Sequence, residues 1–140
     1  MTMRFEVVTP KGAKVSAEAA AVSAPGTLGE LDVLPGHRPL ITSLGIGLLS
    51  YASGSERHYL VVNGGFLEVA DDKLVVITET AETPDEIDVE RAEKSLKEAE
   101  ERLKELGDEA GSALEFALDS KKRALARIEA AKLKKQAIPE

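Results

Sequence analysis

The sequence predicts an α+β fold, with a β-rich region first and a helical region after it. From Met3 to about Thr80, apolar residues recur with a period near two, and glycine, proline and asparagine appear at short intervals. After Ala81 the apolar residues recur every three or four positions, which is the period of an amphipathic helix. We therefore expect a β-domain over residues 1–84 and a helical hairpin over residues 85–140.

Short strands are predicted over residues 4–8, 14–22, 45–52, 57–62, 65–70 and 73–78. Turn-forming sequences such as Pro-Lys-Gly and Ala-Asp-Asp-Lys separate them. The pentapeptide "VNGGF" at residues 62–66 is the clearest hairpin signal, because Asn-Gly and Gly-Gly tolerate the positive φ angles of tight turns. Six or more strands in a region of this length predict a β-sandwich or a barrel, since one sheet alone could not bury both faces.

Two amphipathic helices are predicted in the second region. The first should end at Gly107, because glycine takes the left-handed C-terminal conformation without a steric clash. The second should begin at Ser112, which has the spacing of a capping box with Glu115. A connection of about five residues predicts an antiparallel hairpin. The expected apolar stripes are Val89, Ala92, Leu96, Ala99, Leu103 and Leu106 in the first helix, and Leu114, Ala117, Leu118, Leu125, Ile128 and Ala131 in the second.

The start of the first helix and the mobility of the hairpin each have two interpretations. Asp88 can cap the helix by accepting the N–H of residue 90 or 91, while Thr83 with Pro84 and Glu86 offers a competing start. Both stripes are rich in alanine, which buries little area, so closure of the hairpin should be only modestly favourable. A weakly closed hairpin permits a conformational switch. The alternative is a hairpin that simply completes the fold.

Composition and charge exclude several classes of protein. The net charge of −7 argues against a general nucleic-acid binder, and the chain has no cysteine for disulfides or thiolate metal sites. No apolar run reaches the roughly 18 residues of a membrane span, so we expect a soluble, cytoplasmic chain. Residues 85–119 carry thirteen acidic and five basic residues, whereas residues 120–140 carry two acidic and seven basic ones. The end of an acidic protein is therefore basic.

No catalytic or metal-binding motif is recognisable. The sequence lacks a Gly-x-Ser-x-Gly elbow and a Walker phosphate loop, and "GIGLLS" lacks the third glycine of a dinucleotide fingerprint. His37 and His58 are the only histidines, and they lack metal-ligand spacing. Asp71 and Asp72 fit a turn better than an acid–base pair, because adjacent strand residues point to opposite faces. We expect neither catalysis nor a metal.

The order of four segments resembles one known family. "GELDVLPGHRPLIT", "VNGGFLEV" and "IDVERAEKSLKEAEERL", followed by an alanine-rich helix, resemble the epsilon subunit of the bacterial F-type ATP synthase over the whole chain. The resemblance implies a ten-stranded β-sandwich and a two-helix hairpin on the central stalk of the rotor, at the cytoplasmic face of the plasma membrane. It implies a non-catalytic subunit that couples the gamma subunit to the c ring and inhibits ATP hydrolysis through its helices.

The resemblance also implies partner-binding residues. Glu30 and His37 occupy positions that face the rotor ring and gamma, while glycine and proline there are equally explained as turn formers. When the hairpin extends, the basic second helix meets an acidic segment of the beta subunits, and the charges provide orientation. The candidate residues there are Lys121, Lys122 and Lys132. The alternative is a binding module whose helices are permanently packed.

A regulatory ATP site is a further implication, with no cofactor required. By resemblance, Asp88 and Arg91 contact the nucleotide, Arg123 and Arg127 meet its phosphates, and Glu82 lies beside adenine. One basic position of the family is occupied here by Glu98, which puts the affinity in question. Alternatively, Asp88 only caps the helix, and the two arginines of the second helix are solvated or pair with Asp119 and Glu129.

Overall fold

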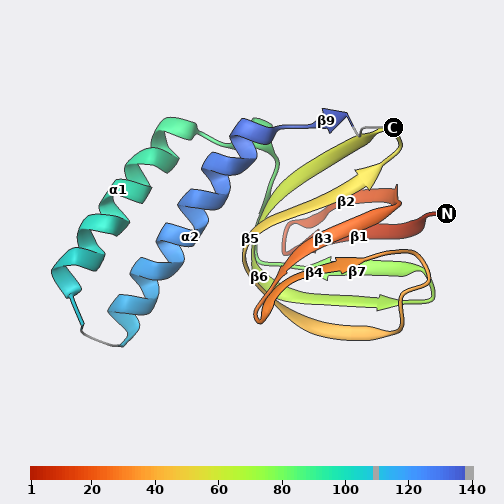
Figure 1. The fold of residues 1–140 in the computed structure, drawn as a ribbon, viewed down its shortest axis with the longest axis horizontal. Helices are drawn as coiled ribbons and strands as arrows, with labels where there is room; N and C mark the ends of the chain where they lie inside the picture. The colour runs from red at the N-terminus through yellow and green to blue at the C-terminus, as the bar shows by residue number, and fades with distance from the viewer. Residues whose placement is uncertain (109–110, 138–140) are drawn as a thin grey trace.

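The structure is a computed structural model that describes residues 1–108 and 111–137. A β-sandwich forms one part and two antiparallel helices the other, with α2 lying between α1 and the sandwich (Figure 1). The α+β prediction is confirmed, and the change from strands to helices occurs near residue 84, as the change of period predicts.

The described residues form a sheet system of nine strands. They are β1 (Met3–Thr9), β2 (Gly12–Ala19), β3 (Ala21–Gly26), β4 (Gly29–Val33), β5 (Leu40–Ser53), β6 (Glu56–Ala70), β7 (Lys73–Ile77), β8 (Ala81–Glu82) and β9 (Gln136–Ala137). The neighbours follow the order β2-β1-β7-β6-β5-β3-β4, and β8 and β9 both pair with β6. All pairs are antiparallel except β1 with β7.

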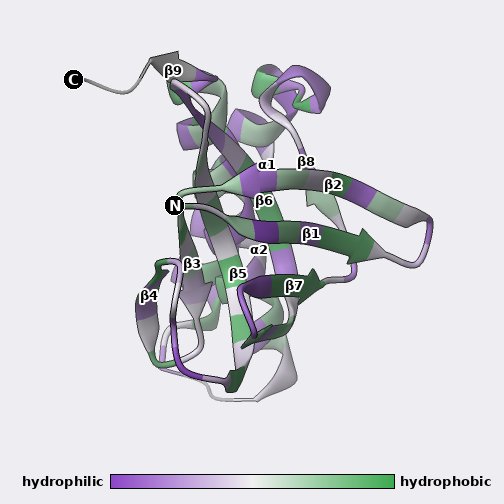
Figure 2. Cartoon of the chain, turned by 90° about the vertical axis from the view of Figure 1, so that its right-hand side faces the viewer, coloured by the Kyte–Doolittle hydropathy of each residue, from purple (hydrophilic) through white to green (hydrophobic). Residues whose placement is uncertain are grey.

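Strands β5 and β6 belong to both layers of the sandwich. Their first and second halves take different neighbours: β6 pairs with β9 and β8 early and with β7 late, and β5 pairs mainly with β3 in its second half. Figure 2 shows β3 and β4 on one side, β1, β2 and β7 on the other, and β5 and β6 between them. Eight strands lie before the helices instead of the expected ten, because these two long strands each run unbroken between the layers, and the ninth strand, β9, follows α2.

The predicted hairpin at "VNGGF" is wrong. Asn63, Gly64 and Gly65 lie inside β6, where the strand bends between the layers instead of reversing. Gly65 has a φ of 107°, and a Cβ on it would lie 1.9 Å from Ile77 O, so only glycine fits this position. The strand predicted over residues 14–22 is also divided, because the chain leaves β2 and enters β3 around Ala20.

The sandwich core consists of side chains from the inward faces of both layers. The largest of them are Phe5, Met3, Leu49, Leu60, Leu67 and Leu74, each almost fully buried. Inward and outward residues alternate along β1, β7 and the last part of β6, as half-buried strands require, whereas residues 59–62 of β6 are buried on both faces. This core holds the framework on which the surface residues discussed below are placed.

Both proposed starts of the helical region are present in the structure, one after the other along the chain. A short 3₁₀ turn, η1 (Pro84–Glu86), follows Thr83, and α1 (Val89–Leu106) then begins with Asp88 as its N-cap. Asp88 Oδ1 accepts the backbone N–H of Arg91 at 3.1 Å. Gly107 ends α1 with a φ of 58°, which confirms the predicted stop.

Helix α2 (Ser112–Leu133) corrects two predictions. Its N-cap is Gly111, whose carbonyl accepts the Glu115 N–H at 3.1 Å, so the Ser112 capping box does not form. Its buried residues are Ala117, Ala124, Ala126 and Ala130, whereas Leu118 and Leu125 are 40% and 46% exposed. Because α2 lies between α1 and the sandwich, it needs two closely approached faces, and small side chains occupy both. The leucines therefore lie on a third, outer face.

Candidate functional site

The junction between α2 and the sandwich contains most of the predicted nucleotide residues. Arg127 Nε lies 2.8 Å from Glu82 Oε1, and this ion pair joins the middle of α2 to β8. The two side chains are 31% and 26% exposed, so solvent screens the pair less than an ordinary surface pair. The alternative that Arg127 pairs with a residue of its own helix is not what the structure shows.

A second polar contact of α2 reaches the bend in β6. Arg123 Nη2 donates to Asn63 Oδ1 at 3.4 Å, while Arg123 Nε is buried without a hydrogen-bond partner in the described part of the chain. Asn63 N in turn donates to Thr78 Oγ1 at 3.1 Å, and this hydroxyl donates to Thr80 O at 3.2 Å. The glycine-rich bend thus supplies the docking point for the first arginine of the helix.

Glu86 is a charged member of the junction, although the sequence pattern indicated only a helix start there. Its Oε1 accepts the backbone N–H and the hydroxyl of Thr83 at 3.0 and 2.8 Å, and it pairs with Lys14. The hydrogen bond from Lys14, followed by that from the Thr83 N–H, lowers the Glu86 pKa from 4.5 to about 2. The pattern Thr-x-x-Glu could have located Glu86, but nothing in the sequence identifies Lys14 as its partner.

These residues surround a small cavity of about 190 Å³. Its lining consists of Glu82, Glu86, Asp88, Arg91, Ala92 and Arg127. A neighbouring groove of about 520 Å³ shares three of them and is also lined by Lys11 and Lys14. The structure therefore brings together four of the five predicted nucleotide residues, while Arg123 lies by Asn63 and does not line this cavity. Glu98 faces another cavity, between the helices.

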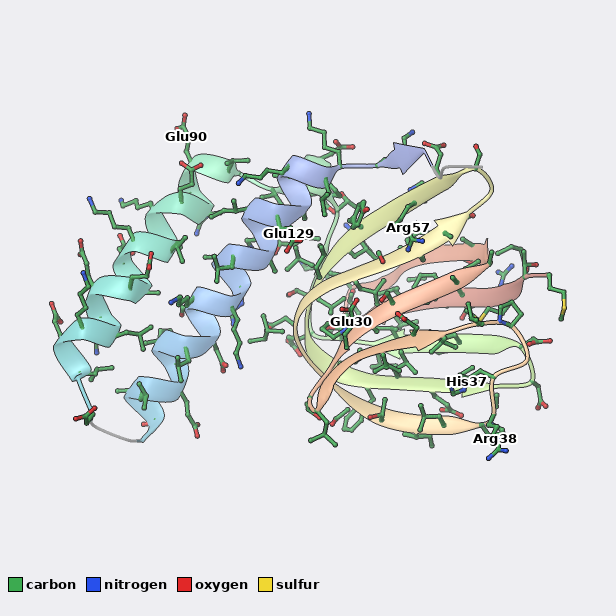
Figure 3. All side chains as sticks on the ribbon, viewed as in Figure 1. Glu30, His37, Arg38, Arg57, Glu90 and Glu129 are labelled. Carbon is green, nitrogen blue, oxygen red and sulfur yellow. The ribbon has the colours of Figure 1, made fainter. Side chains whose placement is uncertain are left out.

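Glu30 and His37 occupy separate surfaces. "GELDV" forms the edge strand β4 instead of a loop, and Glu30 lines a groove of about 710 Å³ together with Arg57, Glu129 and Leu133. Its Oε1 accepts a hydrogen bond from Ser23 at 2.7 Å. Figure 3 shows Glu30 on the side of the sandwich that faces α2, whereas His37 and Arg38 lie at the end remote from the helices.

The loop around His37 is held by its own hydrogen bonds. His37 N donates to Leu34 O at 3.1 Å, and its Nδ1 lies 2.7 Å from Arg38 O. Gly36 N donates to Asp72 Oδ1 at 2.6 Å, which ties the loop to the β6–β7 turn. These hydrogen bonds agree with the interpretation that the residues form a turn. The imidazole also lies at the surface, where a partner could contact it.

The three candidate lysines all lie on α2. Lys122 and Lys132 are exposed, and Lys121 is half-buried. Leu118 and Leu125 lie on the outer face of the same helix, so apolar and basic side chains share it.

An apolar row crosses the outer face of the sandwich. Phe66 lies opposite Ile77 in the β6–β7 pair and Val8 lies opposite Ile77 in the β1–β7 pair. Ile41 is diagonal to Phe66 across the β5–β6 pair. The exposed fractions of Ile41, Phe66 and Ile77 are 70%, 58% and 56%. The sequence pattern does not reveal this row, because alternation alone does not distinguish an exposed apolar position from a buried one.

Among the described residues, no group of three or more histidine, aspartate or glutamate side chains is placed to hold a metal ion. No helix in this part of the chain is long and apolar enough to cross a membrane.

The comparisons with known proteins identify the family. Residues 2–84 match the family of ATP synthase delta/epsilon chain β-sandwich domains. The chain is 46% identical over 131 residues to "ATP synthase epsilon chain 2" of Syntrophotalea carbinolica, covering 92% of this chain and 93% of the relative. The chain belongs to the ATP synthase epsilon family. Another epsilon chain, from Geobacter metallireducens, is also 46% identical, with the same coverage of 92% and 93%.

Solved structures share the fold of this epsilon family member. A chain of the Euglena gracilis mitochondrial ATP synthase, in a structure titled OSCP/F1/c-ring, matches with a TM-score of 0.74 at 23% identity, covering 94% of this chain and 79% of that one. A chain of the Tetrahymena thermophila central stalk/c-ring structure matches with a TM-score of 0.60 at 15% identity, covering 94% and 97%. The sandwich-plus-hairpin architecture therefore also occurs in chains of these two ATP synthase structures.

Proposed function

We propose that this chain is a non-catalytic central-stalk subunit of the F-type proton-translocating ATP synthase, which couples the gamma subunit to the c ring. The observation that carries the proposal is the apolar row Ile41, Phe66 and Ile77, since contiguous exposed apolar surface marks a protein interface. The names of its relatives and the titles of the two matching structures support this choice of assembly. The chain would then be peripheral to the cytoplasmic face of the bacterial plasma membrane through the complex.

Substitutions in the apolar row test this proposal. Phe66→Ser with Ile77→Ser should weaken capture of gamma and the c ring by roughly thirtyfold, because truncating a central interface aromatic costs about 2 kcal/mol or more. The thermal midpoint of the isolated chain should change little, since both side chains are more than half exposed. Phe116→Ser, at an aromatic residue of α2 that is 74% exposed, is the matched control and should leave capture intact. Normal capture by the double variant would contradict the proposed interface.

The hairpin regulates ATP hydrolysis in this proposal. Two polar contacts join it to the sandwich, and α2 contributes only alanines to the apolar contact, so release should cost little. A chain that ends after Asp85 should still assemble and couple the rotor, while ATP hydrolysis by the complex rises. Reversing Lys121, Lys122 and Lys132 to glutamate should give the same increase, because the lysines meet an acidic segment of the beta subunits. Inhibition by the intact chain should weaken at higher salt.

A permanently packed hairpin is the competing function. In that case the complex with the shortened chain and the complex with the full chain hydrolyse ATP equally at every salt and ATP concentration. Arg123 and Arg127 are unsuitable for the charge-reversal test, because both also hold α2 on the sandwich.

ATP is the proposed regulatory ligand of the junction. Arg91, Arg127 and the acidic side chains that line the same cavity lie where a nucleotide would contact both α2 and the sandwich. A guanidinium has five N–H donors, and Arg127 uses Nε for Glu82, so its terminal nitrogens suit a phosphate. Three carboxylates face two arginines around the cavity, so bound phosphate must compete with internal ion pairs. We therefore expect modest affinity.

A further inference from the structure

Helix α2 is followed by a segment that turns back onto the sandwich. Lys134 has a φ of 50° and donates its backbone N–H to Ala130 O at 2.8 Å, which ends the helix. This backbone conformation favours glycine, so a lysine is held in it by the contacts on either side. The next residues form β9, which pairs antiparallel with Glu56 and Arg57 of β6.

Strand β9 covers a part of β6 that, among the described residues, has no other neighbouring strand on that side. One side of β6 pairs with β5 over nearly its whole length. On the other side β8 pairs with Val61 and Val62, and β7 pairs with residues 66–70. The first residues of β6 are paired on this side by β9, as Figure 1 shows at the end of the chain. Since open strand edges attract pairing, the segment satisfies backbone groups that would otherwise face water.

Side chains reinforce the backbone pairing. Lys135 Nζ lies 3.1 Å from Glu56 Oε2. Lys134 and Lys135 also line a cavity of about 420 Å³ with Asp85 and the stacked rings of Tyr51 and His58, whose centroids are 4.9 Å apart. The segment therefore contacts the sandwich and shares a cavity with the chain leading into α1.

The apolar contact between α2 and the sheet is small by comparison. Ala126 and Ala130 pack against Val61, with Leu48 and Ile87 partly buried beside them. Alanine side chains bury little area, so the segment after α2 adds to an apolar contact that is modest by itself.

We propose that residues 134–137 are a latch, and that β9 must leave β6 before the hairpin can leave the sandwich. The latch rests on the proposed regulation by the hairpin for its biological role, but its action is intramolecular. It holds the docked position of α2 through one short strand pair and one exposed ion pair. It is therefore weak enough to open in competition with a partner that binds the released helix.

Distance measurements on the isolated chain test the latch. The natural sequence has no cysteine, so Lys11→Cys and Glu101→Cys place two spin labels on exposed positions of the sandwich and of α1. The full chain should give one short distance between the labels when measured by double electron–electron resonance. A chain that ends at Lys135, and so lacks β9, should give an additional population at longer distance.

Charge reversal gives the second arm without removing any residue. Glu56→Lys or Lys135→Glu should raise the long-distance population by up to about fivefold, which is the range of an exposed ion pair. The variant with both reversals re-forms the pair and should return this population to that of the unaltered chain. Lys134→Gly is the matched control, because it relaxes the backbone while retaining β9, and should keep the short distance.

Circular dichroism checks that each variant retains its helices. If shortening the chain lost helix, the charge-reversal arm would decide. A short distance unchanged by shortening and by both single reversals would overturn the latch. Because no other subunit is present, that result would leave the proposed control of hydrolysis standing. Conversely, if the latch variants shifted the distances but the shortened chain left ATP hydrolysis by the complex unchanged, the latch would stand and the proposed control of hydrolysis would fail.

Discussion

Arg127 of α2 and Glu82 of β8 form a 2.8 Å ion pair although 45 residues separate them in the chain. Arg127→Ala should lower the free energy of unfolding of the helical region by about 1–2 kcal/mol. This lies between the roughly 0–1 kcal/mol of an exposed pair and the 3–5 kcal/mol of a buried one. Urea denaturation followed by circular dichroism measures the change.

A double-mutant cycle with Glu82→Ala isolates the pair from the other effects of each substitution. Arg102→Ala, at an exposed position of α1, is the control and should change stability by less than about 0.5 kcal/mol. Strictly additive effects of Arg127→Ala and Glu82→Ala would show that the pair does not hold the helix.

ATP should raise the melting temperature of the isolated chain if it binds the folded junction. A ligand at a hundred times its Kd stabilises the native state by about 2.7 kcal/mol. Arg91→Ala or Arg127→Ala should remove the shift, whereas Lys97→Ala, on an exposed turn of α1 outside the cavity, should retain it. An unchanged melting curve at millimolar ATP would rule out a physiological ATP site.

Glu30→Ala with His37→Ala should weaken association with gamma or the rotor ring while leaving the thermal midpoint nearly unchanged. Neither side chain anchors the core, since its hydrogen bonds within the described part of the chain go to nearby surface groups. Because the two residues lie on separate surfaces, the single variants should affect different partners.

Asp72→Ala is the contrasting variant for that experiment. It removes the acceptor of the Gly36 N–H, so it should loosen the His37 loop and lower the midpoint. A lower midpoint with normal assembly in the Glu30 and His37 variants would mean that both residues are structural only.

Glu86 should make stability depend on acidity below its ordinary pKa. Its pKa falls from 4.5 unfolded to about 2 folded, so the stabilisation is complete above 4.5 and is lost as the pH falls through about 2. Because the carboxylate is 47% exposed, solvent screening limits the effect to less than about 1 kcal/mol. Lys14→Met should raise the Glu86 pKa, which a carboxyl NMR titration measures. A pKa that stays near 2 would remove Lys14 as its main cause.

Local signals predicted the parts of the fold that depend on a few neighbouring residues. Asp88 and Gly107 bound α1 because capping and left-handed termination are decided within one turn. "VNGGF" misled for the same reason, since the glycines that permit a tight turn also permit a bend inside a strand. Only the neighbours of β6 decide between the two.

Tertiary contacts decided the rest. The buried face of α2 depends on having two partners, so a single leucine stripe gave the wrong face. The resemblance named Glu82 and Arg127, but their pairing joins distant segments and has no sequence signal. Lys14 and Asn63 were missed because their roles come from the register of β2 and the bend of β6.

The parallel pairing of β1 with β7 has a consequence for how the chain acquires its structure. Phe5 lies beside Leu74, so the first strand obtains this neighbour only after about half of the chain has been synthesised. Contacts between such distant segments slow folding, because the loop between them must close before the pairing stabilises anything. The helices depend on local contacts and can form within microseconds. The sandwich should therefore set the folding rate, and the hairpin should wait for a surface on which to dock.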